Sequence, residues 1–254
     1  MSPALSQASF ATADVLGYRV ARCTLEEAAH WGLRAAFDGA LPKLLVTLNP
    51  EIIVRAERDA ALRDALHHAD LTVADGVGVV WAARRAGVQL PGRVPGVELM
   101  TQLLARGGPA LRVYFLGARP GVAERAAAAA RARFGTAVAG VQHGFFRSDD
   151  VEKVVQQVRE SRAQLLIAGL GEGQELFLHR HRAALAAPLM IGVGGALDVL
   201  AGEVKRAPRW THQLGLEWLW RVGGDPKRWY RLPRLVRFAL LVQRSGLERP
   251  TLSG

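Results

Sequence analysis

The sequence predicts an α/β fold, in which a mostly parallel, Rossmann-like sheet carries helices on both faces and is followed by a basic, Trp-rich helical C-terminal appendage. Short, almost continuously apolar runs alternate with stretches of helical periodicity, which is typical of strands buried on both faces of a parallel sheet. Half of the 254 residues are apolar, enough to bury a sizeable core. Arginine and tryptophan concentrate near the C-terminus. We therefore expect an α/β domain at 1–202 and an appendage at 203–254.

The first predicted elements are a short strand region at 15–20 and a helix that begins after Thr24. Thr24-Leu-Glu-Glu27 is a capping-box sequence. The Thr24 hydroxyl can accept a hydrogen bond from the backbone of Glu27, and the Glu27 carboxylate can reach back to the backbone of Thr24.

The next elements form a strand–helix–strand unit. The strand at 43–48 ends at Asn49-Pro50, and Pro50 suits the first turn of a helix at 51–66. A second apolar strand at 71–75 follows this helix. Two strands joined through a helix form a parallel pair.

The same alternation continues along the chain. The expected helices are 76–85, 98–104, 122–134 and 149–161, and the expected strands are 112–117, 136–141, 164–168 and 189–193. A last helix begins at Pro233. It carries Arg234, Arg237 and Arg244 mostly on one side and apolar residues mostly on the other. That apolar face lies in a membrane interface or packs on the protein or on a second subunit.

Composition excludes several classes of protein. The single cysteine, Cys23, excludes a disulfide framework and a cysteine zinc site, so a reducing, cytoplasmic compartment is the simplest expectation. The opening residues lack the pattern of a secretory signal, and no apolar run is long enough to cross a membrane. Disorder is excluded as well, since the apolar content is that of a globular protein.

The expected strands end in residues that suit a binding site. These ends are Thr47 with Asn49, Asp75, Gly117–Arg119, Gly169–Gln174 and Gly192–Gly195, the last of which contains Gly194. Crevices at strand ends, beside helix N-termini, bind phosphorylated ligands. No segment matches Gly-x-Gly-x-x-Gly or the phosphate loop of nucleoside triphosphatases. We therefore expect a nucleotide or sugar-nucleotide site. For Asp75 itself, a chemical role and a role as helix N-cap remain alternatives.

No bound metal and no cofactor are expected. His67 and His68 are adjacent and His179 and His181 are two apart, so neither pair can face one ion from a helix. The sequence contains no Asp-x-Asp and no His-x-x-x-His. The charge of a leaving diphosphate would then be met by arginine and by backbone dipoles.

The C-terminal region carries most of the positive charge. Residues 203–254 contain eleven Lys or Arg against four Asp or Glu, which is +7 of the formal +10. Four of the six tryptophans, Trp210, Trp218, Trp220 and Trp229, lie there too. Arginine with tryptophan suits nucleic acid or an anionic membrane surface, and a merely solvated basic surface is the third alternative.

Four blocks of the sequence resemble the WecG/TagA/CpsF family of bacterial glycosyltransferases, in the order of the family. They are Thr47-Leu-Asn-Pro-Glu51, Ala74-Asp-Gly-Val-Gly-Val-Val-Trp81, Gly192-Val-Gly-Gly-Ala-Leu-Asp-Val-Leu-Ala-Gly202, and Arg206-Ala-Pro-Arg-Trp210 with Gly215-Leu-Glu-Trp-Leu-Trp-Arg221. The resemblance runs from about Val15 to about Arg237, and its tail block is the most specific.

The resemblance implies a metal-independent, inverting transfer of an N-acetylhexosamine-type sugar from a UDP donor to a polyprenyl-diphosphate-linked sugar. It also implies a peripheral position on the inner face of the cell membrane and a role in making a cell-surface polysaccharide or teichoic acid. In this reading 1–202 is the catalytic domain, and the appendage closes over the active site and touches the bilayer. No nucleic-acid partner is then expected, and a homo-oligomer is left open.

Residues of the family map onto this sequence by motif. Asp75 is the implied catalytic base. The implied substrate-binding residues are Thr47, Asn49, Arg93, Gln174, Glu175, Gly194, Arg221, Arg228 and Arg231. The three appendage arginines would supply the positive charge that a metal supplies elsewhere.

The sequence departs from the family at two places. The family's Gly-x-Pro-Lys/Arg-Gln-Glu loop is here Gly171-Glu-Gly-Gln-Glu175, which lacks the proline and the basic residue and places Glu172 where a diphosphate is expected. After Arg231 the family often has Arg-Tyr, whereas this chain has Leu232-Pro233. The competing hypothesis is a non-catalytic basic α/β module that binds nucleic acid or anionic lipid through the tail.

Overall fold

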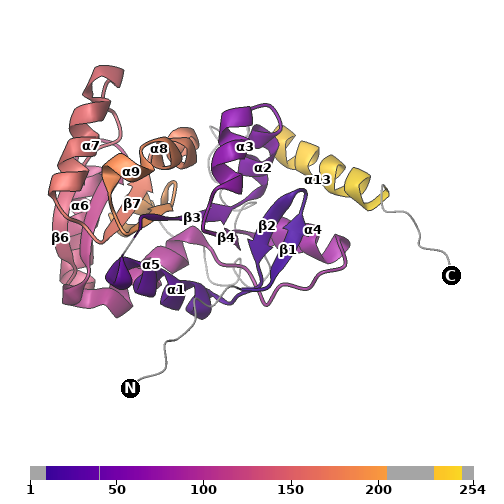
Figure 1. Ribbon diagram of the computed structural model, residues 1–254, viewed down its shortest axis with the longest axis horizontal. Helices are drawn as coiled ribbons and strands as arrows, with labels where there is room; N and C mark the ends of the chain where they lie inside the picture. The colour runs from indigo at the N-terminus through magenta and orange to yellow at the C-terminus, as the bar shows by residue number, and fades with distance from the viewer. Residues whose placement is uncertain (1–9, 40, 205–231, 248–254) are drawn as a thin grey trace.

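A six-stranded, fully parallel sheet forms the centre of the computed structural model, which describes residues 10–39, 41–204 and 232–247 (Figure 1). The strand order is β4-β3-β8-β7-β5-β6. The strands are β3 (Lys43–Leu48), β4 (Leu71–Ala74), β5 (Arg112–Gly117), β6 (Ala137–Gln142), β7 (Leu165–Gly169) and β8 (Leu189–Gly192). The predicted α/β class and the parallel β3–β4 pair are confirmed.

Helices cover both faces of this sheet. Side chains alternate along each strand, so that Leu44 and Val46 of β3 join one apolar cluster and Leu45 joins the other. The second cluster is completed by α1 (Leu25–Asp38), α5 (Gly96–Gly107), α6 (Val122–Phe134) and α10 (Ala196–Leu200). The first is completed by α2 (Pro50–Ala56), α3 (Ala60–His67), α4 (Val77–Arg85), α7 (Val151–Glu160), α8 (Gln174–Arg180), α9 (Arg182–Leu185) and α13 (Leu232–Leu247).

The N-terminal strand region is a hairpin, which corrects the single strand expected at 15–20. Strands β1 (Thr12–Val15) and β2 (Tyr18–Ala21) pair antiparallel. Leu16 and Gly17 both have positive φ, at 54° and 85°, as the central residues of a tight hairpin turn require. The Gly17 N–H donates to Asp14 Oδ1 at 3.0 Å. A glycine between two apolar residues was the signal for this turn.

The single helix expected at 51–66 is two helices. Helix α2 ends at Ala56, and α3 begins at Ala60 after its own N-cap, Asp59. The Asp59 carboxylate accepts from the backbone N–H of Leu62 at 2.9 Å. An aspartate that binds the backbone ahead of it competes with helix continuation, which explains the break. The other expected helices and strands agree with the structure within a few residues at their ends.

Helix α13 lies against α2 and α4 at one end of the molecule, far from α7 and β6 (Figure 1). Its Phe238 and Val242 are buried in the core of the first sheet face. The absence of a side chain at Gly78 of α4 permits this packing, because a Cβ there would lie 3.3 Å from the Phe238 ring. A helix is thus confirmed at 232–247. The tryptophans at 210, 218, 220 and 229 fall outside the described residues.

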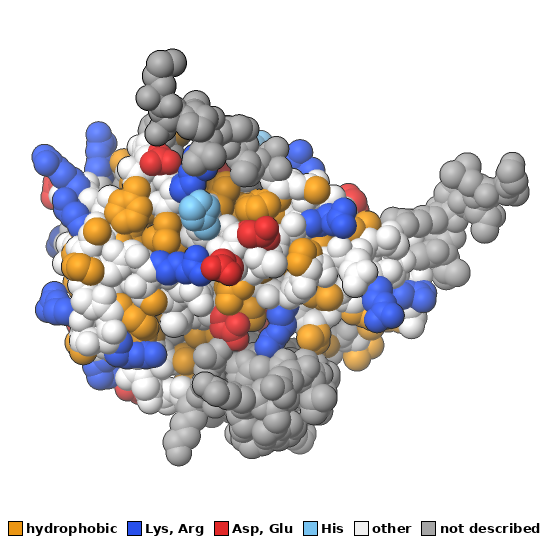
Figure 2. Space-filling view, turned by 90° about the horizontal axis from the view of Figure 1, so that it is seen from below, with side chains coloured by type: hydrophobic (Ala, Val, Ile, Leu, Met, Phe, Trp, Pro, Cys, Tyr) orange, Lys and Arg blue, Asp and Glu red, His pale blue; other side chains and the backbone are white. Residues whose placement is uncertain are grey.

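Two surface properties bear on partners. Among the described residues, no helix is long and apolar enough to cross a membrane. On the face seen in Figure 2, basic, acidic and apolar side chains are interspersed, without a field of one sign. The positive excess of the sequence belongs mainly to residues 203–254.

Candidate functional site

The five predicted loops lie at one edge of the sheet. Because all six strands are parallel, the segments that follow β4, β3, β8, β7 and β5 emerge side by side, in that spatial order. Backbone hydrogen bonds tie neighbouring loops together, from Val193 N–H to the Ala168 carbonyl at 2.8 Å and from Ala118 N–H to the Gly169 carbonyl at 2.9 Å. This carboxyl edge is the expected location of a ligand crevice.

Asp75 lies at this edge, immediately after β4. Its backbone N–H donates to the Leu48 carbonyl at 2.7 Å, which extends the β3–β4 pairing by one residue. The N-cap residue of α4 is Gly76, whose φ of 90° suits glycine. The alternative in which Asp75 serves as the cap of α4 is therefore wrong. Instead, Asp75 Oδ2 accepts from the backbone N–H of Gly96 at 3.4 Å.

Gly96 lies next to both Thr47 and Asp75. The sequence did not predict a role for this glycine. A Cβ at this glycine would lie 3.2 Å from Thr47 Oγ1 and 3.7 Å from Asp75 Oδ2. Gly96 is also the first residue of α5, so the Asp75 carboxylate faces a helix N-terminus, which favours a negative charge there. The Thr47 hydroxyl is buried and donates to the Gly192 carbonyl at 3.1 Å, which joins β3 to the last residue of β8.

Asn49 and Arg93 flank this group. The Asn49 side chain caps α2 by accepting from the Ile52 N–H at 3.1 Å, so its observed contact is structural. Arg93 is half-buried in the loop between α4 and α5. The next residue, Val94, donates its N–H to the Ala74 carbonyl at 2.7 Å and places this loop beside the end of β4.

Gln174 and Glu175 begin α8 and are both buried. The Gln174 amide Nε2 donates to Glu175 Oε1 at 2.7 Å, and its Oε1 accepts from the backbone N–H of Gly194 at 2.9 Å. A Cβ at Gly192 would lie only 2.7 Å from the same Nε2, so a glycine is needed there. The structure therefore brings Gln174, Glu175 and Gly194 together, next to the Gly192 carbonyl that Thr47 contacts.

The Glu175 carboxyl is 2% exposed, and burial raises its pKa above the ordinary value, against the lowering effects of Gln174 and Arg55. Its Oε2 has no hydrogen-bond partner among the described residues. A buried carboxyl of this kind favours its neutral form. In this structure Glu175 holds the Gln174 amide in place.

Glu172, the unexpected acidic residue of the Gly171–Glu175 loop, is neutralised by two arginines. Arg55 of α2 pairs with it at 3.4 Å from Nε to Oε2, and Arg234 of α13 pairs with its other oxygen. A second ion pair joins α13 to α2, from Arg237 Nε to Glu57 Oε2 at 2.7 Å. The loop that departs from the family pattern is therefore bound to the C-terminal helix.

The loop after β5 closes the other side of the edge. Gly117 has a φ of 129°, and a Cβ there would lie 2.4 Å from the Gly169 carbonyl oxygen, so the two strand ends pack backbone against backbone. Arg119 is exposed and lies 3.9 Å from Glu203, which also pairs with Arg125 at 2.8 Å. The start of the appendage is thus attached to α6.

Three predicted substrate-binding residues, Arg221, Arg228 and Arg231, lie outside the described residues. The other six predicted substrate-binding residues, and the expected base Asp75, lie at the carboxyl edge or flank it. Beyond Gly96, the contacts of Gly192, Arg55 and Arg234 were also missed, because they depend on which strand ends and helices become neighbours.

One comparison with known proteins bears on this edge. A family model described as the glycosyl transferase WecG/TagA/CpsF family matches residues 13–251. The match includes every described element of the carboxyl edge and α13.

Proposed function

The chain belongs to the WecG/TagA/CpsF family of glycosyltransferases, enzymes that transfer a sugar, and from this premise we propose an inverting transfer with Asp75 as the catalytic base. The donor is a UDP-linked sugar of the N-acetylhexosamine type. The acceptor is a polyprenyl-diphosphate-linked sugar of a cell-surface polysaccharide or teichoic acid pathway. The family favours this function over a non-catalytic basic module.

The observation that carries the proposal is the meeting of Asp75, Thr47 and Gly96. A carboxylate at the carboxyl end of a parallel strand is well placed to act on a ligand in the crevice. The Gly96 N–H and the N-terminus of α5 orient it and favour its anionic form, which a base requires. The Thr47 hydroxyl donates to the Gly192 carbonyl and so lies at the base of the proposed crevice, between β3 and β8.

The reaction needs one proton acceptor and a stabilised leaving group. Asp75 takes the proton of the acceptor hydroxyl while that oxygen forms a bond to the anomeric carbon. The bond from the anomeric carbon to the diphosphate oxygen breaks on the opposite face, and UDP leaves with the electron pair. Attack from the face opposite the leaving group inverts the anomeric centre.

The leaving diphosphate requires positive charge. The resemblance assigns this role to Arg221, Arg228 and Arg231, whose planar donor groups match phosphate oxygens, without a metal. Glu172 pairs with Arg55 and Arg234, so its negative charge is compensated and repels the diphosphate less.

The direct test replaces Asp75 by Asn in the full chain. UDP release and product mass are measured with a panel of UDP-sugars and a short-chain lipid-diphosphate-sugar acceptor. We expect Asp75→Asn to lower the transfer rate at least about 100-fold, as for loss of a general base. The donor that gives product identifies the sugar.

The matched control is Asp149→Asn, an exposed carboxylate in the short 3-10 helix before α7. It should transfer at the wild-type rate. Circular dichroism establishes that each variant is folded. A folded Asp75→Asn protein that transfers as fast as wild type would rule out the base assignment, while failure of wild type with every donor would count against the donor class.

A further inference from the structure

A cluster of two histidines and one aspartate lies on α3, its C-terminal cap and α8, away from the carboxyl edge. Asp64 and His68 are four residues apart, so one turn of helix places them on the same side, and His179 approaches from α8. The ligand atoms of the three side chains all lie within 4.8 Å of one another. The cluster contains no His-x-x-x-His motif. It combines an Asp-x-x-x-His pair, Asp64 and His68, with a histidine that is distant in sequence.

Each histidine approaches one oxygen of the Asp64 carboxylate, and His68 Nδ1 also lies 2.9 Å from the Asp64 backbone carbonyl oxygen, a contact that a bound ion would displace. His68 Nδ1 lies 3.2 Å from Asp64 Oδ1, and His179 Nε2 lies 3.3 Å from Asp64 Oδ2. Ligand atoms of a tetrahedral zinc ion, with bonds of about 2.0–2.1 Å, lie about 3.3 Å apart. The two imidazole rings are 5.4 Å apart by their centroids, so modest ring rotation brings both nitrogens to one ion.

His179 makes its polar contact on the side of the cluster. Nδ1 of His179 is buried and has no hydrogen-bond partner among the described residues, so its polar contact with Asp64 runs through Nε2. Asp64 and His68 are exposed, which leaves a coordination position open to water. The neighbouring His67 and His181 point elsewhere, with His67 stacked on Tyr18 and His181 packed on Phe177.

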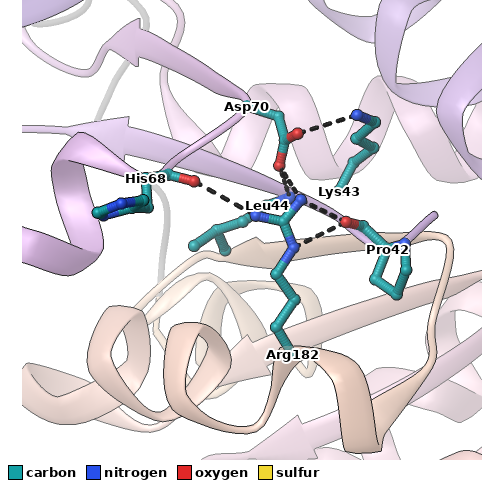
Figure 3. Close-up of polar contacts among 6 residues, drawn as sticks. All are labelled: Pro42, Lys43, Leu44, His68, Asp70 and Arg182. Carbon is teal, nitrogen blue, oxygen red and sulfur yellow. Dashed lines mark hydrogen bonds and ion pairs between the residues drawn. The ribbon is translucent and has the colours of Figure 1, made fainter.

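The backbone that carries His68 is fixed by a separate set of polar contacts (Figure 3). Arg182, at the start of α9, donates to the His68 carbonyl at 3.3 Å and also pairs with Asp70. Asp70 in turn accepts from Lys43 Nζ at 3.0 Å and from the Leu44 backbone at 2.9 Å. Figure 3 shows the His68 ring directed away from this group of contacts. The segment is thus rigid before any ion binds, which lowers the ordering cost of coordination.

We propose that Asp64, His68 and His179 form a binding site for a divalent transition metal of the zinc class, which joins α3 to α8. An ion bound at the nitrogen of each imidazole that faces Asp64 requires the neutral form of both rings. The site lies where α3 leads into β4, at the opposite end of β4 from Asp75, and we assign it a structural role. It secures α3, which leads to Asp75, and the far end of α8, which begins with Gln174. This proposal does not depend on the sugar transfer.

The test is zinc binding by the full chain, freed of metal and of any affinity tag. Zinc is titrated against a chromophoric chelator, and cobalt is added separately to record the visible bands of a four-coordinate centre. We expect one equivalent of zinc and a rise in Tm on its addition. Both His68→Gln and Asp64→Asn, at exposed positions, should weaken binding at least about tenfold and abolish the rise in Tm.

The matched controls are His67→Gln and His181→Gln, which remove an imidazole from the same two helical regions but outside the cluster. They should bind zinc as wild type does. The proposal is overturned if folded wild-type protein binds no stoichiometric zinc, or if His68→Gln binds zinc as tightly as His67→Gln. Transfer activity is not needed for either outcome.

Discussion

Thr47 and Asp75 approach each other because residue 96 has no side chain. A methyl group there would lie 3.2 Å from Thr47 Oγ1, closer than side chains ordinarily pack. The same logic applies at Gly192, where the missing Cβ makes room for the Gln174 amide. At the scale of single residues, the site therefore depends on glycines as much as on the polar groups that bear chemistry.

Glu175 provides a test of this buried network through pH. Burial raises its pKa, so the folded protein binds a proton more readily than the unfolded chain. The contribution of this proton to the free energy of unfolding is fully present below 4.5, the ordinary pKa of a glutamate carboxyl. It is lost as the pH rises through the raised pKa of Glu175. Glu175→Gln removes the titration and keeps an acceptor for Gln174. We therefore expect the variant to be more stable than wild type at neutral pH.

The measurement is urea unfolding of wild type and Glu175→Gln between pH 4 and 8. The difference in unfolding free energy should be small at pH 4 and grow with pH, by about 1.4 kcal/mol for each unit by which the pKa is raised. Glu124→Gln, at an exposed position of α6, should follow wild type throughout. Parallel pH curves for wild type and Glu175→Gln would contradict the prediction.

At the scale of elements, the helix starts are the best-predicted features. The capping box of Thr24 and Glu27 is present with both of its hydrogen bonds, and Pro50 occupies the first turn of α2. These features involve residues three or four positions apart and can be recognised from sequence. The break between α2 and α3 was missed, although the cap of Asp59 on Leu62 is equally local.

The ion pairs of Glu172 connect two elements that are distant in sequence. Glu172→Gln removes the charge that holds Arg55 and Arg234, so α13 should open more often. Exposed pairs contribute about 0.2–1 kcal/mol, which corresponds to an increase of up to about fivefold in amide exchange. Hydrogen exchange followed by mass spectrometry should detect this change in α13 and in the loop at 171–175.

The control for this prediction is Glu152→Gln, at an exposed position in the first turn of α7. It should leave exchange in α13 unchanged. If Glu172→Gln also leaves α13 exchange unchanged, the pair with Arg234 contributes nothing to docking of the helix, which then depends on the packing of Phe238 and Val242 and on the Arg237–Glu57 pair.

At the scale of the whole molecule, α13 divides its apolar residues between two surroundings. Phe238 and Val242 pack in the core, whereas Val236 is 61% and Leu240 is 47% exposed. Trp81 of α4, 39% exposed, lies beside Phe238 with ring centroids 6.4 Å apart. The apolar residues of α13 therefore do not form one face. Phe238 and Val242 pack on the protein, whereas Leu232, Val236 and Leu240 form an exposed stripe at four-residue spacing.

This stripe tests the membrane contact that the family resemblance implies. Val236→Asp combined with Leu240→Asp should lower binding to vesicles of anionic phospholipid at least about tenfold, because each buried aliphatic side chain contributes about 1.5–3 kcal/mol. Flotation or co-sedimentation measures the bound fraction. Deletion of 203–254 is a poorer test, since it also removes Phe238 and Val242 from the core.

The matched control replaces Gln243 by Asp and Ser245 by Asp on the same helix, at exposed polar positions. It adds the same charge and should reduce binding far less than the variant of the stripe. If both variants lose vesicle binding equally, the added negative charge is the cause. If neither variant loses vesicle binding, α13 does not contact the membrane.

The sequence by itself determined the α/β class, the central strands, most of the longer helices and the family, whereas the short helices α8, α9 and α10 were not predicted. These properties are local, because apolar periodicity, caps and turn residues act over a few positions. The motifs that identify the family are likewise contiguous. Even the Leu16-Gly17 turn and the Asp59 cap were available in the sequence, although they were not recognised.

Only the tertiary structure decided which of these segments meet. Strand order depends on how helices pack across the sheet, and it is this order that places Gly96 between Thr47 and Asp75 and the Gln174 amide against Gly192. The Glu172–Arg234 pair and the Asp64–His68–His179 cluster arise in the same way. Such contacts join residues tens to more than a hundred positions apart, and no periodic pattern encodes them, because they result from the packing of complete elements.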